Sequence, residues 1–98
     1  MNIGQYTVDE ILTVLNSLRL RATYGAVGGA IGVNPRSVSL LLGDRRPAAS
    51  WVVNKRSRMP TDYLPHQRHP QLEEHPTVIE SGTQLLGLMR EHRSILGR

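Results

Sequence analysis

The sequence predicts a small single domain that is mainly α-helical, contains a helix-turn-helix and has minor β content at most. Three observations predict this class. The chain has 98 residues, which is the size of one domain. It has no Phe, one Trp and three Tyr, so Leu, Ile, Val and Met must supply most of the core, as in small packed helices. Apolar residues recur at helical spacing, and residues typical of helix caps precede these runs.

The first helix is expected to begin after Thr7 and to end near Leu18. Thr7, followed three residues later by Glu10, is a capping-box pattern in which each side chain accepts a hydrogen bond from the backbone N–H of the other residue. The apolar stripe of this helix consists of Val8, Ile11, Leu12, Leu15 and Leu18.

Residues 24 to 30 are expected to form a second, glycine-rich helix. Gly25, Gly28 and Gly29 lower its intrinsic helix propensity. Glycines are tolerated in a helix where two backbones must approach closely, so they indicate close packing at this point. The alternative is that this helix is the least stable one of the domain.

A third helix is delimited by Asn34, Pro35 and Gly43. Asn is a favourable N-cap, Pro fits the first helical position because its missing N–H has no partner there, and Gly suits the position after the last turn. Helical spacing places Val38, Leu41 and Leu42 inward and turns Arg36, Ser37, Ser39 and Leu40 outward.

The second and third helices, joined by a turn at Gly32, form a helix-turn-helix pattern inside a strongly basic segment. Residues 19 to 58 contain eight basic side chains and one acidic side chain, Asp44. Such a cluster is typical of a surface that binds phosphates. We therefore expect duplex DNA to be bound by Tyr24, Arg36, Ser37, Ser39, Arg45, Arg46, Lys55, Arg56 and Arg58.

Two structural alternatives stay open for this basic region. An ordinary pair of packed helices with a solvated basic surface would give the same pattern. Arg45 and Arg46 would also suit the negative C-terminal end of the third helix, where positive charge is favourable.

The run from residue 6 to residue 63 resembles the C-terminal DNA-binding domain of the alkylguanine-DNA alkyltransferases and of their non-enzymatic alkyltransferase-like relatives, a winged helix-turn-helix. The matching stretches are Tyr6-Thr7, Thr23-Tyr24-Gly25, Arg36-Ser37-Val38-Ser39, Trp51-Val52-Val53-Asn54 and Tyr63. The resemblance implies that the third helix enters the minor groove and that a nucleotide is rotated out of the stack. It further implies that Arg36 fills the gap, that Tyr24 lies beside the target phosphate and that Tyr63 faces the flipped base.

The chain departs from this family where the family performs its chemistry. In the alignment on Val52 and Val53, Ala49 stands at the alkyl-accepting cysteine of the P-C-H-R motif and Ser50 stands at its histidine. The alkyltransferase-like proteins have Trp at the cysteine position, whereas Trp51 lies two residues later. The chain has no cysteine at all, so alkyl transfer to sulfur is impossible. We therefore expect a non-enzymatic protein with no catalytic residue and no cofactor.

Trp51 and Tyr63 are the candidates for a base pocket. Trp51 is the only Trp of a chain without Phe, which favours a core position for it, with stacking on a base as the alternative.

The last third of the chain differs in character from the rest. Residues 1–63 are expected to form the DNA-binding core, and residues 64–98 a Pro- and His-rich segment with a C-terminal helix that packs on this core. Ser81 and Gln84 offer a second capping-box pattern at the start of that helix. Its apolar residues suit either packing on the core or a homodimer contact; they are Leu85, Leu86, Leu88 and Met89.

The histidines of this segment do not predict a metal site. His66, His69 and His75 lack an accompanying Cys, and Arg68 would repel a cation, so we expect no bound metal. No apolar run approaches the roughly 20 residues needed to span a bilayer. We therefore expect a cytoplasmic protein that makes no membrane contact.

Three functions compete at this level. The first is a non-enzymatic binder of duplex DNA similar to the alkyltransferase-like proteins. The second is a sequence-specific helix-turn-helix transcriptional regulator that reads the major groove, as a dimer. The third is a protein-interaction module that offers its basic face to an acidic partner.

Overall fold

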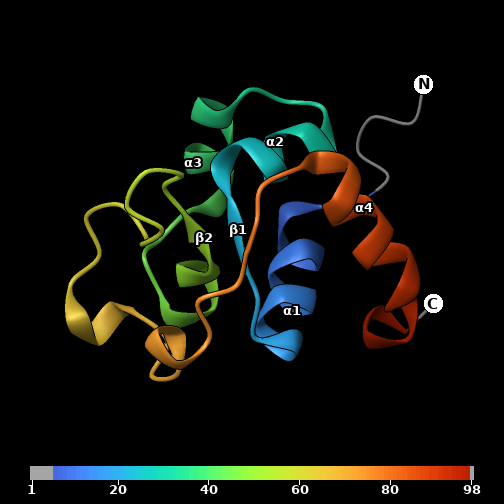
Figure 1. Ribbon diagram of the computed structural model, residues 1–98. Coiled ribbons are helices and arrows are strands. Elements are labelled where there is room, and N and C mark those ends of the chain that lie inside the picture. Colours follow the sequence, from blue (N-terminus) through green and yellow to red (C-terminus); the bar gives the residue numbers. More distant parts are fainter. Residues whose placement is uncertain (1–5, 98) are drawn as a thin grey trace.

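The computed structural model describes residues 6–97 and shows a mainly α-helical domain around a small sheet (Figure 1). The elements in chain order are α1 (Val8–Leu18), β1 (Arg21–Thr23), α2 (Tyr24–Ile31), α3 (Pro35–Leu42), the 3-10 helix η1 (Pro47–Trp51), β2 (Val52–Val53), η2 (Pro65–Gln67), η3 (Leu72–Glu74), β3 (Val78–Ile79), α4 (Gly82–Glu91) and η4 (Arg93–Leu96). The prediction of a small, mainly α-helical domain with minor β content is confirmed, and so are all four predicted α-helices.

Helix α1 begins and ends as its sequence predicts. The Thr7 hydroxyl accepts from the Glu10 N–H at 3.1 Å, and the Thr7 N–H donates to the Glu10 carboxylate at 2.9 Å. The helix stops at Arg19, which adopts the left-handed conformation with φ 58°. Its buried side chains are Val8, Ile11, Leu12, Val14 and Leu15.

Two of the three glycines of α2, Gly28 and Gly29, lie where other backbones come close. A Cβ atom added to Gly28 would lie 2.6 Å from the carbonyl oxygen of Val33, in the turn that leads to α3. A Cβ atom added to Gly82, the first residue of α4, would lie 2.8 Å from the carbonyl carbon of Gly29. The close-packing interpretation of these two glycines is therefore confirmed, whereas Gly25 is exposed and makes no such close approach.

Helix α3 has the predicted caps but a narrower buried face than expected. The Asn34 side chain accepts from the Ser37 N–H at 3.0 Å, and Gly43 follows the helix with φ 70°. Val38 and Leu42 are buried, but Leu41 is 53% exposed, so its predicted inward position is wrong. The helix has only about two turns and buries a single i, i+4 pair, Val38 and Leu42, and Leu41 is turned about 100° from Leu42.

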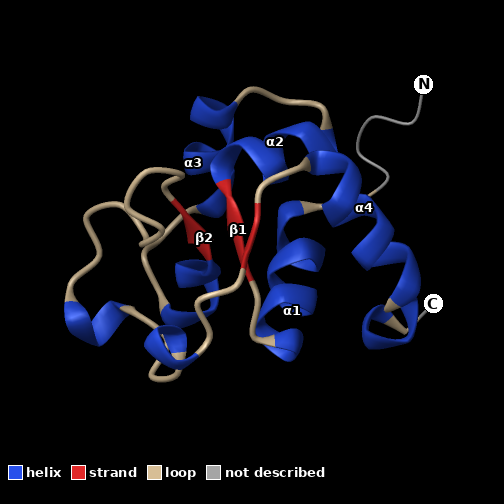
Figure 2. Cartoon of the chain, viewed as in Figure 1, coloured by secondary structure: helices blue, strands red, loops and turns tan. Residues whose placement is uncertain are grey.

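The sheet has three short parallel strands in the order β2-β1-β3 (Figure 2). Strand β1 is central and pairs with both neighbours, with Ala22 opposite Val52 on one side and opposite Ile79 on the other. Strand β3 comes from the last third of the chain, next to β1 in Figure 1. Residues far apart in the sequence therefore share one sheet.

Residues 64–97 share the hydrophobic core with the preceding residues. Their buried side chains include Leu72, Ile79, Leu85 and Met89. Helix α4 packs on α2, and its N-cap Ser81 accepts from the Gln84 N–H at 3.3 Å. Among residues 6–97, no helix combines the length and the apolar character that crossing a membrane requires.

Candidate nucleic-acid interface

Polar and charged residues follow the carboxyl ends of the three parallel strands and lie at one edge of the sheet. Because Thr23 is paired with Val53, the residues that follow them, Tyr24 and Asn54, come close together. Glu80 follows β3 at the same edge. This edge is where ligands bind in open parallel sheets, since the loops that leave the strands surround it.

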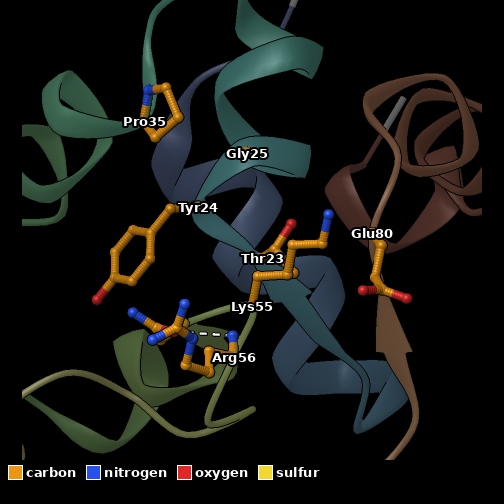
Figure 3. Close-up of a pocket in the computed structure, with 8 residues that line it drawn as sticks. Thr23, Tyr24, Gly25, Pro35, Lys55, Arg56 and Glu80 are labelled. Atoms are coloured by element: carbon orange, nitrogen blue, oxygen red, sulfur yellow. Dashed lines mark hydrogen bonds between the residues drawn. The ribbon is translucent and has the colours of Figure 1, made fainter.

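Two hollows in the surface meet at Tyr24. The larger has a volume of about 910 Å³, and it is lined by Thr23, Tyr24, Gly25, Pro35, Asn54, Lys55, Arg56 and Glu80 (Figure 3). The smaller has a volume of about 320 Å³, and it is lined by Tyr24, Ser39, Leu42, Gly43, Arg45, Thr61, Asp62 and Tyr63. The Tyr24 side chain is thus a wall shared by both.

A turn after β2 presents Lys55 and Arg56 to the larger hollow. The Asn54 side chain accepts from the Arg56 N–H at 2.8 Å, and the Asn54 N–H donates to the Met59 carbonyl at 3.0 Å. These bonds fix the turn, while both basic side chains remain exposed. In Figure 3 they lie between Tyr24 on one side and Glu80 on the other.

The basic residues of this region fall into two groups. Among residues 6–97, the charged groups of Arg36, Arg45, Lys55 and Arg56 have no hydrogen bond or ion pair with another side chain, and all four are exposed. We call these four the free cations. They are available to a ligand because the fold does not use their charge.

Arg46 and Arg58, by contrast, have partners within the chain. The Arg46 guanidinium donates to the carbonyl oxygens of Leu42 at 2.7 Å and Asp44 at 3.0 Å. It therefore caps the C-terminal end of α3, which is the structural alternative that the sequence left open for it. Arg58 lies 3.8 Å from the Glu80 carboxylate.

Tyr63 lies buried against the smaller hollow, with its hydroxyl near the backbone of Arg46. Burial raises the pKa of Tyr63, and a hydrogen bond with the Arg46 backbone partly opposes this rise. The phenol therefore stays protonated at neutral pH and can donate a hydrogen bond. Ser39 and Arg45 line the same hollow, whereas Ser37 is half-buried and lines neither.

Trp51 belongs to the core. Its side chain is fully buried, its indole N–H donates to the Asn16 side chain at 2.9 Å, and its ring centroid lies 5.0 Å from that of His69. A fully buried ring has no face on which a base can stack, so the structure places Trp51 outside the candidate base pocket. Ala49 is buried beside it.

Ser50 has no freedom to act as a nucleophile in this arrangement. Its hydroxyl donates to the Pro47 carbonyl at 2.6 Å and accepts from the His69 N–H at 2.9 Å. The side chain is fully buried. The segment that aligns with the P-C-H-R motif of the alkyltransferases therefore has a structural role within residues 47–69.

Asn54 and Arg21 each have a structural role that was not predicted from the sequence. Asn54 directly follows the apolar pair of β2, and an Asn at a strand end is a recognisable turn signal. Arg21 lies in the central strand, where its guanidinium donates to the carbonyl oxygens of Arg58, at 2.7 Å, and Leu72. One of the eight basic side chains between residues 19 and 58 is therefore buried, and it holds the long loop after β2.

Comparison of the chain with protein families, with curated proteins and with solved structures finds no match. In the part of the chain that the structure describes, no three His, Cys, Asp or Glu side chains gather as metal ligands would.

Proposed function

We propose that the protein binds duplex DNA without altering it chemically, and that α2, the turn after it and α3 act as a helix-turn-helix. The observation that carries this proposal is the set of free cations, three of which, Arg45, Lys55 and Arg56, line the two hollows that meet at Tyr24. Lys and Arg side chains without a partner in the protein are the groups that neutralise phosphates and release their counterions.

The residues of α3 have separate roles in this proposal. Arg36 lies in the first turn of α3 with its side chain in solvent, so it can reach a phosphate or a base edge. Ser39 is small and exposed, and it allows the helix to approach a groove closely. Arg45 follows α3 beyond Gly43 and extends the positive charge along the duplex.

Tyr24 and Tyr63 provide the part of the proposal that concerns the base. Both line the hollow of about 320 Å³, and both match tyrosines of the alkyltransferase-like pattern. In that role, Tyr24 contacts a phosphate, and the protonated hydroxyl of Tyr63 donates to a nucleotide turned out of the duplex.

The second candidate function is a sequence-specific regulator that reads the major groove. The outer face of α3 is exposed, and the major groove of B-DNA admits an α-helix without being widened, which favours this second candidate. Helix α4 leaves little apolar surface for a dimer contact. Leu85 and Met89 are buried in their own chain, so only the half-buried Leu86 and Leu88 remain.

Fluorescence anisotropy with a labelled duplex of about 20 base pairs tests the proposal. We expect binding whose logarithmic affinity falls linearly with the logarithm of salt concentration, with a slope of about −0.9 for each phosphate contact. A matched duplex with one alkylated guanine separates lesion recognition, which predicts tighter binding, from general DNA binding, which predicts equal binding.

Single-alanine variants locate the interface in the same assay. Arg36→Ala, Lys55→Ala and Arg56→Ala should each weaken binding and reduce the salt slope by about one contact. Arg90→Ala is the matched control, because Arg90 is an exposed arginine on α4, away from α3 (Figure 1). No binding at low salt, or an equal effect of the control, would refute the proposal.

A further inference from the structure

Leu40 stands out on the outer face of α3. Of the large apolar side chains that the structure describes, it is the most exposed, at 84%. The fold does not need it, because Val38 and Leu42 hold α3 on the core. A single exposed leucine is ordinary on a protein surface. Leu40 is a candidate for contact with a ligand because it shares its helix with Arg36, which is exposed and has no ion-pair partner among the described residues.

The surroundings of Leu40 form a ridge with open space at its end. Arg36 precedes Leu40 by four residues, so both side chains lie on the same face of α3. Gly43, three residues later, has no side chain, and apart from Gly43 itself and its two chain neighbours no residue has an atom within 4 Å of the place where its Cβ would be. Ser39 beside it is small. Leu40 thus projects past its neighbours on the helix.

The charges near this ridge indicate the chemistry of the ligand. Arg36 and Arg45 have no partner within the described residues, and an apolar protein partner would bury these cations without compensation. Duplex DNA compensates both features, since its phosphates neutralise the cations and its stacked bases provide an apolar interior. Leu is one of the side chains that proteins insert between base pairs.

We propose that Leu40 inserts between two adjacent base pairs when α3 enters a groove of duplex DNA, so that it partly unstacks them and bends the duplex. The proposal rests on the proposed function, because it assumes that α3 faces DNA. It assigns two tasks to one helical turn: Arg36 binds the backbone or fills space beside it, and Leu40 opens the stack.

Duplexes that contain 2-aminopurine at a central thymine-adenine step test the proposal. Such pyrimidine-purine steps unstack most easily, and 2-aminopurine becomes brighter when its stacking is lost. Anisotropy measured on the same duplexes reports binding independently. We expect saturating wild-type protein to raise the 2-aminopurine fluorescence several-fold.

The variants separate insertion from binding. Leu40→Ala should abolish the fluorescence rise and weaken binding by about tenfold, which corresponds to about 1.4 kcal/mol. Leu40→Met keeps a long apolar side chain and should preserve the rise. Leu41→Ala is the matched control on the same helix, since Leu41 is turned about 100° from Leu40.

Each contrary result has a distinct meaning. If the wild type does not bind, the proposed function and this inference both fail. If the wild type binds but the 2-aminopurine fluorescence rises at none of the tested base-pair steps, the insertion of Leu40 is refuted and DNA binding stands. The same conclusion holds if Leu40→Ala retains the rise. Loss of the rise in Arg36→Ala alone would assign insertion to Arg36 and likewise refute it for Leu40.

Discussion

Replacement of Gly28 by alanine tests whether the stability of the α2–α3 connection depends on a close backbone contact. In the interior of an ordinary helix this change stabilises the protein by about 0.5–1 kcal/mol, because alanine loses less backbone entropy than glycine. At Gly28, however, the new Cβ would lie 2.6 Å from the Val33 carbonyl oxygen. That atom belongs to the backbone of the turn, so it cannot move away as a flexible side chain would.

The expected size of the effect follows from these two opposing contributions. Overpacking costs about 1–3 kcal/mol, and a clash with backbone belongs at the upper end of that range. After the gain in helix propensity is subtracted, Gly28→Ala should lower the free energy of unfolding by about 1–2 kcal/mol. In a domain of this size such a loss lowers Tm by about 5–15 °C.

Gly87→Ala provides the matched control. Gly87 lies in the interior of α4, and outside its two chain neighbours and the adjacent backbone of the helix no atom lies within 4 Å of its added Cβ. This variant should therefore gain about 0.5–1 kcal/mol and melt a few degrees higher than the wild type. Thermal unfolding followed by circular dichroism compares the two. A Gly28→Ala protein as stable as Gly87→Ala would refute the close-contact explanation.

Three further predictions concern side chains that form hydrogen bonds inside the fold. Asn16→Ala removes the acceptor of the Trp51 indole N–H and should destabilise the protein by about 1–3 kcal/mol in urea unfolding. Arg21→Met leaves two loop carbonyls without their donor, so limited proteolysis should cut the loop after β2 faster than in the wild type. The pKa of His69 is lowered, first by burial, and its Nδ1 accepts from the Gln71 N–H, so the unfolded chain binds a proton more readily. Stability should therefore fall as pH drops below about 6.5, the ordinary pKa of histidine, and less steeply in His69→Gln.

The helices could be predicted from the sequence because their signals are local. Thr7 and Asn34 each cap a helix by bonding to a residue three positions along the chain, and such pairs are visible in the sequence. The strands could not be predicted in the same way. They have two or three residues each, and β3 is recruited to the sheet by pairing with the distant β1. Two or three residues are too few to show the alternating apolar pattern that predicts a strand from sequence. These strands form because tertiary packing brings them together.

The candidate interface shows the same division between local and tertiary information. Arg36 and Ser39 were predicted on the outer face of α3, and both are exposed there. The charge pattern alone could not separate the free cations from Arg46, whose guanidinium caps α3, or from Arg21, which is buried under the loop. That separation depends on which carbonyl oxygens the folded chain leaves without another donor.

Mapping of amide chemical shifts on ¹⁵N-labelled protein during titration with a duplex tests the central proposal most directly. We predict that the shifts cluster at Tyr24, at residues 36–45 and at residues 54–56, and that they shrink as salt is added. The amides of α4 and η4 serve as the internal reference and should stay in place. Shifts concentrated on α4 and η4, or no shifts at low salt, would contradict the assignment of a DNA-binding surface to α2 and α3.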